Sequence, residues 1–279
     1  MVEIEEIMNV KQCDKCAVLV NSCDKYEDAW MPFYKLANKY WPECPYRHYL
    51  NTERKQFKVE GIDVDVLNLK EGIADLQVPW GKRLKDCLER INTPYVLLLL
   101  EDFFMQATVD QQELDRCIDM MESDKRFVAI YFKQIDGFKE IYEKEPKYFL
   151  MSENIMYKLN LQAGLWRKSE LEALIGDDDT PWSFEFVAQN RLEGQDKIFL
   201  CSRAGTHYDY KGAVFPYLTG RSTGYGIWTG KWLWNNDKLF KKNGIQTGEI
   251  HLQRFSRFDM FKYYCRRVKE EIAKKFNKK

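Results

Sequence analysis

The sequence predicts an α/β protein built on a largely parallel sheet. The run from Tyr95 to Leu100 is apolar almost throughout, which is typical of a strand buried on both faces. Ahead of it, the patterns come in the order strand, helix, strand, strand, helix, strand, the order of a parallel α/β half. Apolar residues make up 45% of the 279 positions, enough for the core of one large domain.

Short apolar runs and helical patterns define the elements of the first hundred residues. A polar loop, Asn21 to Asp28, separates the first strand from the first helix, and Trp41-Pro42 ends that helix. Asn92-Thr93-Pro94 ends the second helix and leads into the strand at 95–100. We expect strands at 17–20, 46–50, 64–69 and 95–100, and helices at 30–40 and 84–91.

The later elements carry capping signals. Asp110-x-x-Glu113 predicts the start of a helix that runs through Met121, and Ser169-x-x-Glu172 caps a short helix that ends at Gly176. We expect strands at 127–132 and 198–201, with 155–159 as a partner of the former, and a helix that begins near residue 182. Residues 205–236 lack a period and read as a long surface loop.

The C-terminal segment differs from the rest in charge and pattern. Residues 254–279 hold ten Lys/Arg and three Asp/Glu, a net charge of +7, and apolar residues recur every three or four positions. We expect a flexible leader at 1–14, an α/β domain at 15–250 and a basic amphipathic helix at 251–279. Either residues 254–276 lie on an anionic membrane surface, or the apolar stripe docks on the domain.

Composition excludes several classes of protein. A net charge of zero argues against nucleic-acid binding. The acidic start lacks the apolar core of a signal peptide, and we expect a cytoplasmic protein, placed at the inner face of the cell membrane if the C-terminal helix binds there.

The eight cysteines are expected as free thiols. Cys13-x-x-Cys16 has zinc or redox spacing, but a second pair is missing, which disfavours zinc.

Two adjacent carboxylates, Glu101 and Asp102, come directly after the buried strand. The residues that come after a parallel strand lie at the carboxyl edge of the sheet, where α/β proteins bind ligands. Carboxylates there suit a divalent cation, Mn²⁺ or Mg²⁺, and through it a diphosphate. The alternative is an acidic turn that only ends the strand.

Four segments in order resemble the inverting glycosyltransferases of the GT-A fold, especially bacterial enzymes that build capsule, exopolysaccharide or lipopolysaccharide. The segments are Val18 to Asp24, Trp80 to Asp102, Gly164 to Gly176 and Pro181 to Phe186. The resemblance covers residues 17–205. It implies a Rossmann-like nucleotide-binding sheet flanked by helices, a nucleotide-sugar donor with uridine as the commonest base, and a saccharide or lipid-linked acceptor.

The resemblance also implies roles for particular residues. Asp102 would bind the metal directly, whereas Glu101 would contact the metal, the ribose hydroxyls or a bound water. The family usually has Asp-x-Asp at this point, so the metal itself is an open question. His207 would be a further metal ligand. Glu185 would take the proton of the acceptor hydroxyl, and Trp182 would pack against the acceptor sugar.

Other polar residues near the first strand are candidates for nucleotide binding. Carboxylates and amides satisfy base N–H and ribose hydroxyl groups, and a basic side chain reaches a diphosphate. Each is also explained as ordinary loop or helix-surface polarity. These candidates are Ser22, Asp24, Asn51, Glu53 and Arg83.

The sequence therefore favours a glycosyltransferase and leaves two alternatives. A sugar nucleotidyltransferase would use the same sheet edge and metal, but it usually has a glycine-rich loop after the first strand, and residues 21–30 contain no glycine. A non-catalytic carbohydrate-binding protein would keep the fold without the chemistry.

Overall fold

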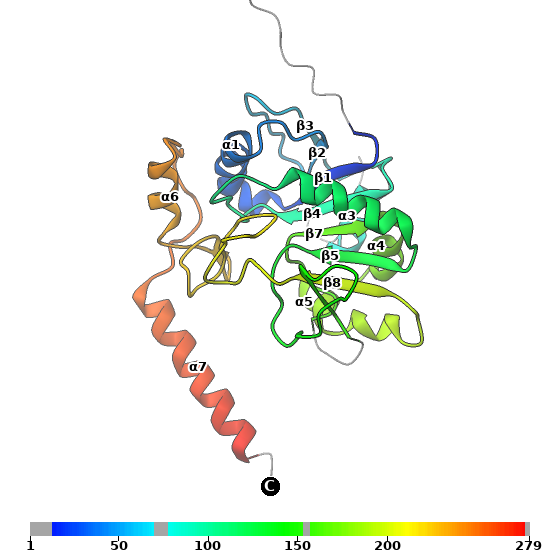
Figure 1. Cartoon of the computed structure of the whole chain (residues 1–279). Helices are drawn as coiled ribbons and strands as arrows, with labels where there is room; N and C mark the ends of the chain where they lie inside the picture. The colour runs from blue at the N-terminus through cyan, green and yellow to red at the C-terminus, as the bar shows by residue number, and fades with distance from the viewer. Residues whose placement is uncertain (1–12, 70–77, 153–156, 277–279) are drawn as a thin grey trace, which may run out of the picture.

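The computed structural model describes residues 13–69, 78–152 and 157–276. Most of the leader expected at 1–14 lies outside these ranges. The described part is a mixed α/β structure with a large central sheet that has helices on both faces (Figure 1).

The central sheet holds eight strands of the described residues in the order β3-β2-β1-β4-β7-β5-β8-β6. Strands β3, β2, β1 and β4 run parallel, β7 is antiparallel to β4 and to β5, and β8 is parallel to β5. The bounds are β1 Cys16–Asn21, β2 Arg47–Asn51, β3 Val64–Leu67, β4 Tyr95–Leu100, β5 Phe127–Tyr131, β6 Tyr148–Leu150, β7 Gly164–Arg167 and β8 Ile198–Ser202.

The helices cover both faces of this sheet. Alternate residues of β4 point to opposite faces, so Leu97 and Leu99 join the core with α1 and α3, whereas Val96 and Leu98 join the core with α2 and α4. The bounds are α1 Trp30–Tyr40, α2 Trp80–Leu88, α3 Gln111–Ser123, α4 Lys168–Leu174, α5 Pro181–Phe186, α6 Asn236–Lys242 and α7 Arg257–Phe276, with 3-10 helices η1 Asp24–Ala29 and η2 Ala188–Leu192.

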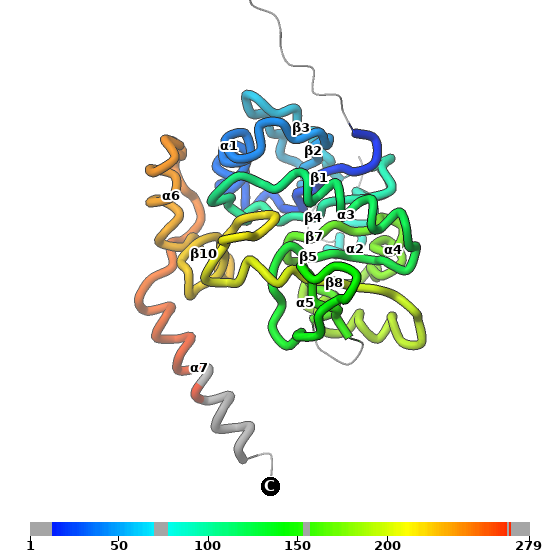
Figure 2. Tube along the Cα trace, in the orientation of Figure 1, coloured from blue at the N-terminus to red at the C-terminus, as the bar shows by residue number. Residues whose placement is uncertain are grey.

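A small hairpin and two helices end the chain. Strands β9, Ile227–Trp228, and β10, Lys231–Trp232, pair with each other within the long loop expected at 205–236. Helix α7 then leads away from the sheet (Figure 2). Phe258, Phe261 and Val268 are all more than half exposed, so these residues of the apolar stripe do not dock on the domain. The prediction that the apolar stripe docks on the domain is therefore wrong for these three residues.

One expected strand pairing is also wrong. Strand β5 pairs with β7 and β8, and not with residues 157–159, the described part of the expected partner. Residues 155 and 156 lie outside the described ranges, and 157–159 form a turn. Tyr157 has a φ of +69°, which an extended strand does not allow.

Candidate functional site

Several of the predicted site residues lie at the carboxyl edge of the parallel strands. Asn21 at the end of β1 is in register with Asn51 of β2 and with Leu100 of β4. The residues that come after these strand ends, among them Ser22 and Glu101, therefore lie side by side. The Asn51 amide donates to Oδ1 of Asn21 at 2.7 Å, which fixes both amides at this edge.

The acid pair after β4 is buried. Glu101 and Asp102 are 6% and 8% exposed. Burial, together with the charge of Asp102, raises the pKa of Glu101 well above its usual range, and burial raises the pKa of Asp102. A hydrogen bond with Ser22 opposes the shift at Glu101. Two carboxylates that repel each other away from water are stabilised by a divalent cation or by a shared proton.

A loop that is distant in sequence contacts Asp102 of this pair. The backbone N–H of Ile227 donates to Oδ2 of Asp102 at 2.8 Å. Gly226 has a φ of +85°, and a Cβ at this position would lie 2.7 Å from the same oxygen. The loop at 220–230 therefore contacts the predicted metal ligand directly.

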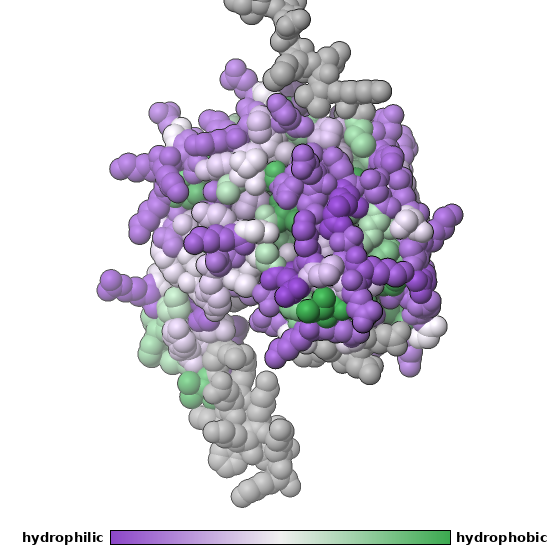
Figure 3. All heavy atoms as spheres, viewed as in Figure 1, coloured by the Kyte–Doolittle hydropathy of each residue, from purple (hydrophilic) through white to green (hydrophobic). Residues whose placement is uncertain are grey.

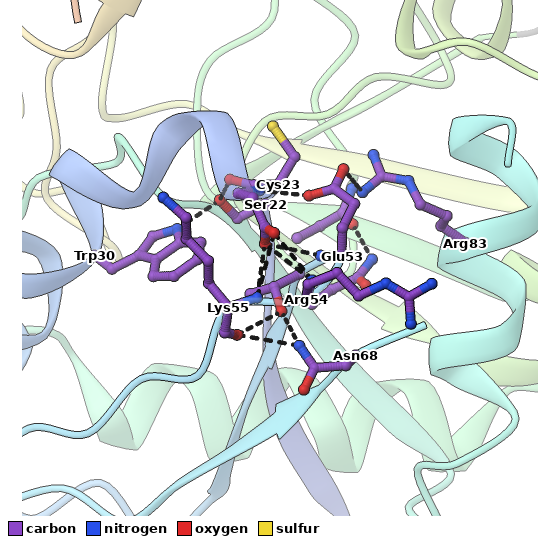
Figure 4. A network of polar contacts seen from close by, with 12 residues as sticks. Ser22, Cys23, Trp30, Glu53, Arg54, Lys55, Asn68 and Arg83 are labelled. Atoms are coloured by element: carbon purple, nitrogen blue, oxygen red, sulfur yellow. Dashed lines mark hydrogen bonds and ion pairs between the residues drawn. The ribbon is translucent and has the colours of Figure 1, made fainter. Parts of the chain in front are cut away.

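Asp24, Glu53 and Arg83 form one network that joins the loops after β1 and β2 to α2, and Figure 4 shows Glu53 and Arg83 within it. The Asp24 carboxylate accepts backbone N–H groups of residues 53, 54 and 55 at 3.0–3.2 Å. Glu53 accepts from the backbone N–H of Asp24 and pairs with the Arg83 guanidinium. This network holds the two loops after β1 and β2 together, so Asp24 stabilises these loops whether or not it also binds a nucleotide.

Ser22 is held between this network and the acid pair. Its hydroxyl accepts the indole N–H of Trp30 at 2.7 Å, and it is 6% exposed. Trp30 begins α1, so the packing of that helix sets the position of a predicted donor-binding residue.

Glu185 lies on α5, which begins with a capping box between Thr180 and Ser183. Its carboxylate accepts the backbone N–H of Leu161 at 2.9 Å. Burial raises the pKa of Glu185, and the Leu161 hydrogen bond opposes this shift. Of the aromatic residues beside it in sequence, Phe184 is in the core, whereas Trp182 is 69% exposed.

Strand β7 connects Glu185 to the same sheet edge. Because β7 is antiparallel to β4 with Gly164 opposite Leu98, the residues just before β7 lie beside the end of β4. Leu161 is one of these residues. Near Glu185 in sequence, Trp182, Phe186 and Val187 are exposed, and the Phe186 ring centroid lies 5.3 Å from that of Tyr157.

His207 comes after β8, in the direction away from β4. Burial and the charge of Lys133 lower its pKa. Among the described residues, no three His, Cys, Asp or Glu side chains form a group that could hold a metal ion, and this includes the neighbourhood of Cys13 and Cys16. The assignment of His207 as a metal ligand stays a prediction.

Two residues at this edge, Tyr217 and Lys133, were not predicted from the sequence. Tyr217 stacks on Phe103 with ring centroids 4.4 Å apart, and its hydroxyl accepts the backbone N–H of Ala163 at 3.1 Å. Lys133 comes after β5 and is 1% exposed. Neither residue belongs to a recognisable motif, and only the packing of the loop after β8 brings Tyr217 to the site.

No family model matches the chain, and no curated protein does. Among solved structures, S. aureus TarS 1-349 is similar at 12% identity with a TM-score of 0.44, over 68% of this chain and 59% of that chain. A longer TarS structure matches over 36% of its length. A cytidylyltransferase from Leptospira borgpetersenii is similar at 14% identity with a TM-score of 0.41, over 86% of this chain and 100% of that chain. Likeness at this level decides neither the fold family nor the reaction.

Proposed function

We propose that the protein is an inverting glycosyltransferase of the GT-A type that takes a sugar from a nucleoside diphosphate, with uridine as the first base to test. The observation that carries the proposal is the buried acid pair at the end of β4. It lies at the same edge as the polar ends of β1 and β2, where a nucleotide has amides and hydroxyls to bind.

The acid pair fits a divalent cation. Both carboxylates are buried and the charge of Asp102 raises the pKa of Glu101, so a cation would relieve a repulsion that the fold imposes. Asp102, with Glu101 beside it, would hold Mn²⁺ or Mg²⁺. Such an ion offsets negative charge on a diphosphate leaving group.

Glu185 supports the acceptor half of the proposal. Inversion needs a base for the acceptor hydroxyl, and a carboxylate with a raised pKa is better suited to this than an exposed one. The exposed Trp182 beside it offers an aromatic face to an acceptor sugar, either free or lipid-linked.

Helix α7 supports a peripheral position on an anionic membrane. Its residues Phe258, Phe261, Tyr264 and Val268 are exposed, Figure 3 shows hydrophobic surface where the helix begins, and the segment from residue 254 on is strongly basic. Its inward side is tied to the domain by an ion pair of Asp259 with Lys231 at 2.6 Å. Within the described residues, no helix has the length and apolar character to cross a membrane.

Release of product separates this reaction from its alternatives. The protein is incubated with Mn²⁺ and either UDP-sugars together with a panel of free and lipid-linked saccharide acceptors, or nucleoside triphosphates together with sugar phosphates. A glycosyltransferase releases UDP, a nucleotidyltransferase releases pyrophosphate, and a carbohydrate-binding protein releases neither. A thermal-shift screen of the same nucleotides comes first, because a ligand at a hundred times its Kd raises the melting temperature by about 5 °C. Absence of both a shift and UDP release would overturn the proposal.

A further inference from the structure

Lys133 carries a buried ammonium group. Its Nζ donates to the backbone carbonyl of Tyr217 at 3.2 Å and lies 3.9 Å from the centroid of the Tyr217 ring. No Asp or Glu of the described ranges forms an ion pair with it, whereas the buried acids Glu113 and Asp179 both have basic partners. An ammonium has three N–H donors, and one carbonyl and one ring leave this group under-satisfied. Burial lowers the pKa of Lys133 to about 8.

Lys133 lies on the far side of β7 from the acid pair. Strand β5 is separated from β4 by β7 alone, and Phe132 donates to Ala163 at 2.8 Å just before Lys133. Neighbouring strands are about 4.8 Å apart, so the ends of β4 and β5 are about 10 Å apart at this edge. A substrate with a diphosphate, or with a sugar between two charged groups, is long enough to span this distance.

Tyr217 stands between the two charges. Its ring lies against the Lys133 ammonium, and burial, with a smaller contribution from the charge of Asp102, raises the pKa of its hydroxyl. The hydroxyl also donates to Oε1 of Gln162 at 2.9 Å. The edge is therefore negative at β4 and positive at β5, with one aromatic residue fixed between them.

The other groups near Lys133 do not remove its charge. His207 is close enough for the lysine to lower its pKa, and a neutral imidazole leaves the ammonium uncompensated. Asp136 raises the pKa of His207 but forms no ion pair with Lys133. A desolvated ammonium in such a place gains most from a bound oxyanion, because a charge-assisted hydrogen bond to phosphate or carboxylate replaces the lost water.

We propose that Lys133 binds an anionic group, a phosphate or a carboxylate, of the substrate at the β5 side of the carboxyl edge. The group comes from the donor diphosphate or from an acidic acceptor. The proposal rests on the proposed function only in placing the substrate at this edge.

Calorimetric titrations with uridine, UMP, UDP and inorganic phosphate test it, for the native protein and for Lys133→Met. Methionine keeps the length and the burial, so the variant is expected to melt at or above the native temperature. Lys139→Met, at an exposed lysine of the same loop, is the matched control. Uridine, which has no phosphate, must bind both proteins equally.

Two results support the proposal. Loss of about tenfold or more in UDP affinity in Lys133→Met alone assigns the donor diphosphate as the source. Unchanged UDP affinity, with loss of the phosphate binding that the native protein shows beside saturating UDP, assigns an acidic acceptor. The proposal would be overturned if the native protein and Lys133→Met have equal affinities for UDP and for phosphate. It would also be overturned if the native protein binds neither UDP nor phosphate. If UDP binds neither protein but phosphate binding depends on Lys133, the proposed function fails and this inference stands.

Discussion

Ile227 donates its backbone N–H to the carboxylate of Asp102 at 2.8 Å, across 125 residues of sequence. The bond ties the loop at 220–230 to the acid that we propose as the metal ligand. A cation on Asp102 would share this carboxylate with the loop, so donor binding and loop position are expected to be linked. The same loop reaches α7, because the Arg221 guanidinium lies 3.7 Å from the centroid of the Tyr263 ring.

Gly226→Ala is expected to displace this loop. The new methyl group would lie 2.7 Å from Oδ2 of Asp102, and a φ of +85° is unfavourable for alanine. We expect a loss of about 1–2 kcal/mol in urea-unfolding experiments and a weaker affinity for UDP with Mn²⁺. Gly244→Ala is the control, because Gly244 has a φ of +69° with open space around it. Equal effects on UDP affinity in the two variants would contradict the contact with Asp102.

Glu185→Gln is expected to separate chemistry from donor binding. The amide still accepts the Leu161 N–H but cannot take a proton, so kcat should fall by about a hundredfold or more while UDP affinity stays unchanged. Glu193→Gln, an exposed acid beyond α5, should leave both unchanged. Full turnover in Glu185→Gln would remove this residue from the role of base.

His48 is expected to make the fold sensitive to acid. It is 4% exposed, its Nδ1 has no hydrogen-bond partner among the residues that the structure describes, and burial lowers its pKa to about 4. The unfolded chain binds the proton at an ordinary pKa of about 6.5, so stability is complete above that pH and falls as pH drops toward 4, by about 3 kcal/mol at most. Urea unfolding at pH 7.5 and 5 measures the loss. In His48→Leu the difference between the two pH values should shrink, whereas replacement of the exposed His251 should leave it as it is.

Replacement of Phe261 and Val268 by serine is expected to release the protein from anionic vesicles. Both side chains are exposed on the outer side of α7, so the change should not disturb the domain. The native protein should sediment with vesicles rich in phosphatidylglycerol, less so at high salt, and not with phosphatidylcholine alone. A native protein that never binds the anionic vesicles would refute the membrane role of α7.

The parallel half of the sheet could be predicted because its strands are short apolar runs between clear breaks. The expected strands at 17–20, 46–50 and 95–100 correspond to β1, β2 and β4, and the helix at 30–40 is α1. The predicted edge residues Ser22, Asn51 and Glu101 do lie together, because parallel strands bring their carboxyl ends to one edge.

The rest of the site depends on contacts that local sequence does not encode. Strand β6, Tyr148–Leu150, is too short to give an alternating pattern, and α6 begins only where the long loop expected at 205–236 ends. Three backbone N–H groups donate hydrogen bonds to Asp24, and Tyr217 packs against Lys133, because of how the loops pack over the sheet. Lys133 in sequence looks like any lysine after a strand.

The role of the acid pair as the donor site is best tested by a calorimetric titration of UDP into the native protein and into Asp102→Asn, each with Mn²⁺ and with EDTA. Asparagine keeps an oxygen for the Ile227 N–H but loses the charge that holds the cation. We predict that the native protein binds UDP at least tenfold more tightly with Mn²⁺ than with EDTA, and that Asp102→Asn shows no such gain. Equal UDP affinity in all four titrations, or its absence in all of them, would contradict the assignment of the acid pair as the donor site.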